Sequence, residues 1–284
     1  MLWYKKQADG AMRSTGSGEI IAAGELSVEF DKEIAGSKLK TLLEHAEEVG
    51  GIERLIDSLE AKSLLFKTAF PVDRSTDWRL DAQAFDTVTG AIFPVRRKIA
   101  AIANLLGREK LTDELIKLVY GAGGLSDRML TFAELVPEES KKERRAMRDF
   151  AAEILHFRDP DGVPLMTRWV WDESTASGAL REFIRGNDGL PEIAIDSQPP
   201  TFQGARAWFA EMLAESGFYR GMPMLIDLLL AQAYSDYVKA MSSGLGLAQA
   251  EFGNSHHPIE LLVKLLGIDP KSGRGSKTRE PTLH

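Results

Sequence analysis

Three side chains that can carry acid–base chemistry lie in the middle of the chain. His156 and Asp159 are separated by about one helical turn, and Asp172 follows soon after them. Imidazole and carboxylate groups can move protons near neutral pH, so a pocket that joined these three residues would suit an acid–base enzyme. No serine elbow, HExxH zinc motif, Walker A loop or complete dinucleotide fingerprint is present. We therefore assign no catalytic residue and keep this enzyme site as an alternative.

The same region is rich in side chains that favour binding. They are Arg158, Arg168, Trp169, Trp171 and Arg181. Indole rings contact cations and other rings, and arginine binds carboxylate or phosphate through two hydrogen bonds. We therefore expect a contact surface within residues 156–200, which includes an acidic, proline-containing loop over 186–200. Burial of both tryptophans in the core is the competing interpretation.

Residues 137–158 predict an amphipathic helix. At about 100° per residue, Asp149, Glu153 and His156 share one face, and the apolar side chains centre on the opposite face. We expect the three polar residues to face away from the core, with Arg145 paired to Asp149 one turn on. Glu153 and His156 have the Glu-x-x-His spacing of di-iron carboxylate proteins, but a second such motif is missing. We therefore predict no metal and no cofactor.

Asp227 is an acidic residue within the strongly apolar segment 222–241. Such a segment predicts a helix that runs through the core. A carboxylate at that position should have a buried partner, such as Arg206, Arg220 or Tyr234, or else a raised pKa.

The glycines over 121–124 precede a predicted helix, and residues 155–160 read Leu-His-Phe-Arg-Asp-Pro. Together these segments resemble helix-hairpin-helix proteins related to DNA glycosylases. The resemblance implies nucleic-acid binding next to a basic surface, for which the candidates are Lys117, Arg128, Arg144 and Arg145. The catalytic lysine of that family is missing after Gly124, and Asp172 lies too far downstream to match the catalytic acid. Nucleic-acid binding is therefore a second alternative.

Composition limits the class of protein. The 284 residues have 44% hydrophobic content, no cysteine and a formal net charge of -7. An acidic chain binds nucleic acid poorly in general, because that affinity depends on Lys and Arg displacing counterions. Without cysteine the chain has no disulfides and no thiolate metal site. Together with the absence of a signal-like or membrane-spanning segment, these features predict a soluble, cytoplasmic, non-catalytic accessory or adaptor protein that binds a protein partner or forms a homo-oligomer.

The fold predicted from periodicity is all-α and bundle-like, with a short N-terminal β-hairpin. The hairpin is expected within residues 18–30, where Leu26, Val28 and Phe30 alternate with polar residues. We expect an N-terminal arm over 1–36, a helical domain over 37–270 that divides into halves at 136/137, and a basic tail over 271–284.

Overall fold

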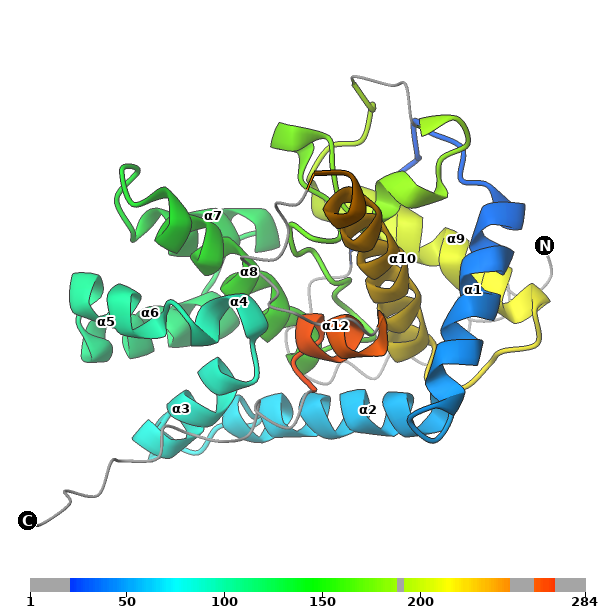
Figure 1. The fold of residues 1–284 in the computed structure, drawn as a ribbon. Helices are drawn as coiled ribbons and strands as arrows, with labels where there is room; N and C mark the ends of the chain where they lie inside the picture. The colour runs from blue at the N-terminus through cyan, green and yellow to red at the C-terminus, as the bar shows by residue number, and fades with distance from the viewer. Residues whose placement is uncertain (1–20, 188–191, 246–257, 269–284) are drawn as a thin grey trace, which may run out of the picture.

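The structure is a computed structural model that describes residues 21–187, 192–245 and 258–268 (Figure 1). Within these ranges the chain is predominantly helical and forms no strand. The α-helices are α1 (Lys32–Glu47), α2 (Ile52–Ala69), α3 (Ala82–Gly90), α4 (Phe93–Arg96), α5 (Ile99–Leu106), α6 (Arg108–Tyr120), α7 (Leu125–Glu134), α8 (Lys141–Arg158), α9 (Pro199–Glu215), α10 (Met222–Leu245) and α12 (Pro258–Leu265). Two short 3-10 helices, η1 (Glu173–Thr175) and η2 (Ala179–Phe183), lie between α8 and α9. The predicted all-α class is confirmed.

The predicted N-terminal hairpin is not supported. Residues 18–20 lie outside the described ranges, and residues 21–30 form only an isolated bridge between Phe30 and Ile184. This extended segment lies against α9 instead. Gly24 N donates to Pro200 O at 2.7 Å, and the Phe30 ring is 5.3 Å from that of Trp208. The alternating apolar residues therefore pack on a helix, not within a sheet.

The first two helices form a helical hairpin. Asp31 caps α1, because its Oδ1 accepts hydrogen bonds from Glu33 N at 2.8 Å and Ile34 N at 3.2 Å. Between the helices, Gly50 and Gly51 have φ values of 101° and 94°, a range that favours glycine. This turn allows α1 and α2 to pack against each other, and α2 then runs along one edge of the molecule (Figure 1).

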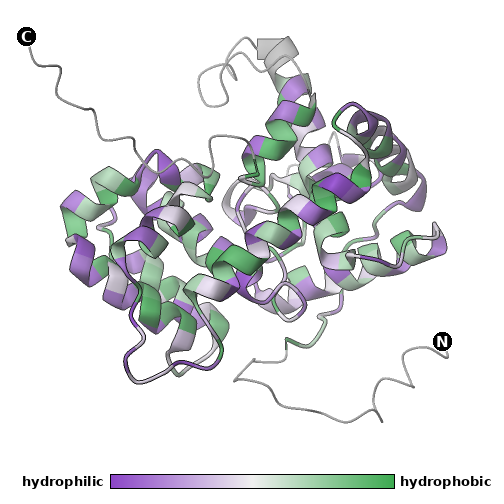
Figure 2. Ribbon diagram, turned by 90° about the horizontal axis from the view of Figure 1, so that it is seen from below, coloured by the Kyte–Doolittle hydropathy of each residue, from purple (hydrophilic) through white to green (hydrophobic). Residues whose placement is uncertain are grey.

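The buried side chains form one contiguous core, with α8 and α10 near its centre (Figure 1). In α10, Leu225, Leu228 and Leu229 are fully buried, which confirms that this segment is a core helix. Hydrophobic and hydrophilic stretches alternate along the helices (Figure 2). The predicted division at 136/137 stays a prediction, and the predicted tail over 271–284 lies outside the described residues.

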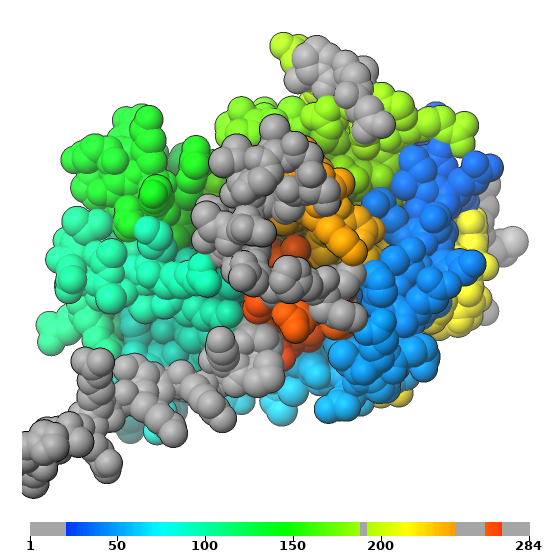
Figure 3. Space-filling model, viewed as in Figure 1, coloured from blue at the N-terminus to red at the C-terminus, as the bar shows by residue number. Residues whose placement is uncertain are grey.

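Helix α12 lies against α1 and α10, and its surface is visible beside blue α1 in Figure 3. Ile259, Leu262 and Leu265 of α12 are buried. Within the described ranges, no helix combines the length and apolar character required to cross a lipid bilayer.

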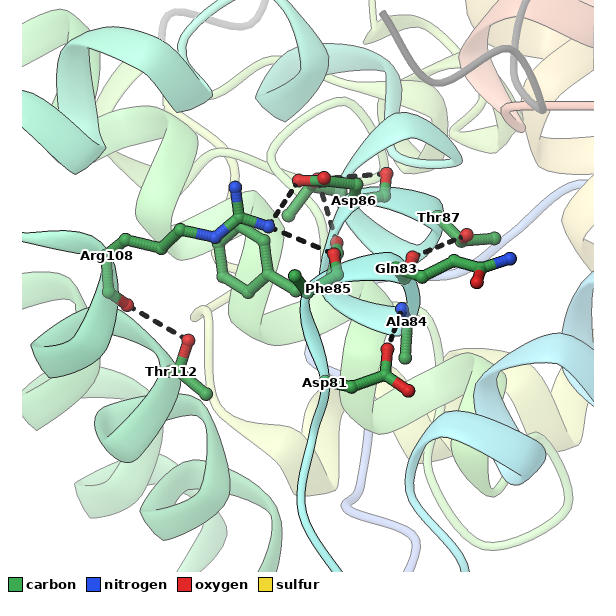
Figure 4. Close-up of polar contacts among 10 residues, drawn as sticks. Asp81, Gln83, Ala84, Phe85, Asp86, Thr87, Arg108 and Thr112 are labelled. Carbon is green, nitrogen blue, oxygen red and sulfur yellow. Dashed lines mark hydrogen bonds and ion pairs between the residues drawn. The ribbon is translucent and has the colours of Figure 1, made fainter.

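The side chain of Arg108, at the start of α6, contacts α3 (Figure 4). Its Nη2 donates to Asp86 Oδ1 at 2.7 Å and to Ala82 O at 3.0 Å, and its guanidinium lies 4.7 Å from the centre of the Phe85 ring. Asp81 caps α3 through a 2.7 Å hydrogen bond from Ala84 N. These contacts hold α3 against α6, which packs beside α7 and α8.

Candidate functional site

Helix α8 carries a row of buried polar side chains. Asp149, Glu153 and His156 are each at most 3% exposed, so the expectation that they face away from the core is wrong. Helix α8 is buried around nearly its whole circumference, because α2, α4, α6 and α7 all contact it. Each of the three side chains has a partner from another part of the chain.

Asp149 is bound by Arg168. Arg168 donates from its backbone N to Asp149 Oδ1 at 2.9 Å and from Nη2 to Oδ2 at 3.2 Å. The predicted pairing of Arg145 with Asp149 is therefore wrong. Burial raises the pKa of Asp149, and the Arg168 charge opposes that rise. Arg168 Nη1 also lies 3.5 Å from Asp172 Oδ2, so two carboxylates hold its guanidinium in place.

Glu153 is paired with Lys62 of α2. Lys62 Nζ donates to Glu153 Oε2 at 2.7 Å and to Leu266 O at 2.7 Å, and it lies 3.8 Å from the centre of the Phe157 ring. Burial lowers the pKa of Lys62 and raises that of Glu153, and in each case the opposite charge of the partner acts against the shift. This ion pair connects α2, α8 and the end of α12 inside the core.

His156 is bound on both ring nitrogens. Its Nε2 lies 2.7 Å from Asp227 Oδ2 of α10, and its Nδ1 lies 2.8 Å from Val163 O. Asp227 therefore has a buried hydrogen-bond partner, and that partner is His156 and not one of the three candidates. Of these, Arg206 lines the same cavity as Asp227, and the Asp227 charge opposes the lowering of its pKa by burial. Arg220 instead forms exposed ion pairs with Glu53 and Asp57.

A small cavity lies next to the His156–Asp227 pair. Its volume is about 20 Å³, which is room for about one water molecule. Apolar side chains form most of its wall, and Arg206 contributes a guanidinium whose Nη1 makes no hydrogen bond within the described residues. Asp159 does not line this cavity, and its Oδ1 accepts a hydrogen bond from Gly162 N at 3.1 Å.

A larger groove lies beside α7. It has a volume of about 250 Å³ and is lined by Ser126, Met129, Leu130, Ala133, Arg148, Met166, Arg168, Trp171, Asp172, Glu173, Ser197, Gln198, Pro199 and Phe202. We call it the α7 groove. Leu130 is 57% exposed, and Arg148, whose charge opposes the rise in the pKa of buried Asp149, is exposed as well. The groove therefore combines exposed apolar surface with a guanidinium that is open to a partner.

The three candidate acid–base residues do not line one common cavity. His156 lines the small cavity, Asp172 lines the α7 groove, and Asp159 lines neither. Both nitrogens of His156 are occupied, so its ring has no nitrogen directed at a substrate. The geometry gives no support to a shared catalytic site of these residues.

The predicted binding residues are divided between the groove and the interior. Trp171 is 2% exposed and Trp169 is also buried, so no flat aromatic surface forms. Arg158 Nε donates to Phe70 O at 3.0 Å, and Arg181 Nη1 donates to Ala176 O at 2.8 Å. Among the predicted binding residues, only Arg168 and Trp171 line the α7 groove.

The basic residues proposed for nucleic-acid binding mostly have local partners. Arg128 Nη1 donates to Leu118 O at 2.6 Å, Lys117 pairs with Glu114 at 2.7 Å, and Arg144 pairs with Glu134 at 3.2 Å. The glycines over 121–124 form the connection between α6 and α7. No observation here favours that alternative.

The sequence analysis missed Met129, Leu130 and Arg148 in the groove and Lys62 beneath α8. Leu130 had a usable signal, because a leucine on the polar side of a short helix is a candidate contact residue. Lys62 had no comparable signal, since its partner Glu153 is 91 residues away.

Comparisons with known protein families, with curated proteins and with solved structures found no match.

Proposed function

We propose that this chain is a non-catalytic accessory protein that binds a short segment of a partner protein in the α7 groove. The observation that carries the proposal is the combination of exposed Leu130 with two arginines in one groove of about 250 Å³. Side chains of another protein fit a groove of this size, whereas the cavity beside His156 admits about one water molecule. The cysteine-free composition is compatible with the cytoplasmic location that we propose with it.

The chemistry of the groove favours a partner segment with a carboxylate and an apolar side chain. Arg168 is held by Asp149 and Asp172, so little side-chain entropy is lost when it receives a ligand. Its Nε is buried and makes no hydrogen bond within the described residues. Arg148 adds a second guanidinium, and arginine binds carboxylates strongly.

Apolar contacts come from the α7 side of the groove. Met129 and Leu130 line it, and methionine adapts to differently shaped apolar partners. Ser197 and Gln198 lie on another wall, which brings part of the predicted partner-facing loop into the site. This arrangement replaces the aromatic surface expected from the sequence with a concave one.

Site-specific photo-crosslinking in the native host tests the proposal. A photoreactive residue at position 130 is expected to give one product of fixed stoichiometry with a partner protein. The same residue at position 105 is the control, because Leu105 is 50% exposed on α5 and does not line the groove. Equal products at both positions, or none at 130, would contradict the proposal.

Two charge variants extend the test to affinity. Arg148→Glu is expected to weaken capture of the crosslinked partner about tenfold or more, because a hydrogen bond to a charged group contributes about 1.5–3 kcal/mol. Arg145→Glu is the matched control, since Arg145 is exposed on the same helix and does not line the groove. Equal losses in the two variants would refute the role of Arg148.

A further inference from the structure

The hydrogen bonds of His156 determine how many protons the ring and its partner carry. Val163 O can only accept a hydrogen bond, so His156 Nδ1, at 2.8 Å, must carry a proton and donate it. The other nitrogen, Nε2, lies 2.7 Å from Asp227 Oδ2. A second proton must lie in that contact, either on the imidazolium or on the carboxylic acid.

Loss of the second proton is incompatible with this geometry. If the remaining proton stays on Nδ1, the lone pair of Nε2 faces the Asp227 carboxylate. If it moves to Nε2, the lone pair of Nδ1 faces Val163 O. In both cases two acceptors oppose each other at hydrogen-bonding distance, so one of the two contacts has to open.

The Val163 contact is connected to a wall of the α7 groove. Val163 belongs to the turn after α8, and the chain continues from it along residues 164–172. Within this segment Leu165 and Val170 line the small cavity, whereas Arg168 and Trp171 line the groove. Phe202 of α9 lines both spaces. The segment is thus a partition with the His156–Asp227 pair on one side and the groove on the other.

The surrounding charged groups do not supply a substitute for the second proton. Arg206 of α9 donates through Nη2 to Asp161 O at 2.7 Å, and the charges of Asp227, Asp161 and Asp159 oppose the lowering of its pKa by burial. The Asp227 charge also acts on Lys62 of α2, and His156 acts on Glu153 of α8. Glu153 of α8 is engaged by Lys62 of α2.

None of these groups hydrogen-bonds to His156, and none to Asp227, within the described residues. The shared proton is therefore required for His156 to hydrogen-bond to Val163 O and Asp227 Oδ2 at the same time.

We propose that the proton shared by His156 and Asp227 is a latch on the wall of the α7 groove. With the proton present, residues 159–172 stay in the groove-forming position. When it is lost as the pH rises, the neutral ring keeps its hydrogen bond to the Asp227 carboxylate, because a charged acceptor binds more strongly than a carbonyl. His156 then releases Val163, the wall shifts, and the groove binds its partner more weakly. The regulatory part of this inference rests on the proposed function of the groove, whereas the movement of the wall does not.

NMR spectroscopy of the full chain tests the movement of the wall. The Trp171 indole N–H donates to Ile195 O at 3.0 Å, and Val163 N donates to Asp159 O at 2.9 Å, so both protons report on this segment. In spectra recorded between about pH 6 and about pH 10, their resonances are expected to shift together with the carbon-bound ring signals of His156. Unchanged resonances while the ring signals of His156 shift would overturn the latch.

The variant Asp227→Asn tests whether the shared proton causes the pH dependence, because it removes that proton and keeps a hydrogen bond to His156 Nε2. The asparagine amide can donate to Nε2 of a neutral His156 while Nδ1 still donates to Val163 O. This variant is expected to keep the wall resonances of the wild type and to lose their pH dependence. If the wall resonances of the variant depend on pH as they do in the wild type, the proposal is overturned. If the variant does not fold, the NMR titration of the wild type is the test of the proposal.

Crosslinking at position 130, measured across the same pH range, separates this inference from the proposed function. Less product at alkaline pH in the wild type, with constant product in Asp227→Asn, supports regulation of capture. Moving resonances without a captured partner at any pH would retain the latch and reject the partner-binding function. Constant capture while the resonances move would reject the regulatory role.

Discussion

Replacing Lys62 by methionine tests whether the buried charges of α8 depend on their partners. The side chains of Lys62 and Glu153 are 3% and 2% exposed, and their charged atoms are 2.7 Å apart. Methionine keeps a long apolar stem but leaves the Glu153 carboxylate without its cation. Removing one member of a buried ion pair costs about 3–5 kcal/mol, so we expect Lys62→Met to lower the free energy of unfolding by that amount.

The double variant Lys62→Met with Glu153→Met tests the cause of this loss. Replacing both members of a buried pair by apolar side chains is often nearly neutral. One cost remains, because Leu266 O loses the 2.7 Å hydrogen bond from Lys62, which contributes about 1 kcal/mol. The double variant is therefore expected to recover all but about 1 kcal/mol of the stability lost by the single variant.

The pH dependence of Lys62→Met has a definite sign. Burial raises the pKa of Glu153 in the folded protein, and without Lys62 nothing in that pair lowers it again. A raised folded-state pKa contributes stability that is present below the pKa of the unfolded chain and lost as pH rises through the folded pKa. The single variant should therefore be weakest at alkaline pH, whereas the double variant should not show this additional loss.

Urea unfolding of the three proteins at about pH 5 and about pH 8 measures these differences, provided that the slopes agree. A double variant as unstable as Lys62→Met would refute the argument, because the loss would then come from packing and not from an orphaned carboxylate. A loss of less than about 1 kcal/mol in the single variant would refute it as well.

Two further predictions concern the packing of α12 and of the groove wall. At Gly267, with φ of 65°, an added Cβ would lie 1.9 Å from Ala91 O, whereas at Gly107, with φ of 82°, it would meet nothing within 4 Å. In thermal unfolding we expect Gly107→Ala to cost about 1–3 kcal/mol from strain and Gly267→Ala to cost about 1–3 kcal/mol more from the clash; equal costs would contradict the predicted clash. Trp171→Phe removes the donor to buried Ile195 O and is expected to cost about 1–3 kcal/mol in urea unfolding, and an unchanged midpoint would show that this hydrogen bond contributes little.

The helices were predictable because their signals are local. Gly50 and Gly51 separate two helical stripes in the sequence, and the structure places α1 and α2 on either side of them. The continuous apolar character of α10 also predicted its central position correctly. The alternation around Leu26 and Val28 was ambiguous, because an extended segment that packs on a helix shows the same period as a strand.

The residues of the candidate site were harder to predict than the helices, because the arginines in the sequence have different hydrogen-bond acceptors in the fold. Arg158 and Arg181 are engaged by backbone carbonyls of Phe70 and Ala176. Arg168 is held by two carboxylates and still lines the groove. Residue type and spacing describe all three in the same way. The difference lies in which carbonyl or carboxylate the fold brings to each guanidinium.

Helix α8 shows why periodicity alone places buried charges wrongly. Asp149, Glu153 and His156 share one face, and a charged face normally indicates solvent. Here each is hydrogen-bonded by a residue from elsewhere in the chain, and the sequence separation is 91 residues for Glu153 and 71 for His156. Asp227 had already indicated that the core contains charge and must contain a partner for it. A charged helical face can therefore lie either in solvent or in the core whenever another predicted core helix carries an acid without a known partner. In the second case, residues of the two helices hydrogen-bond or pair with each other inside the fold.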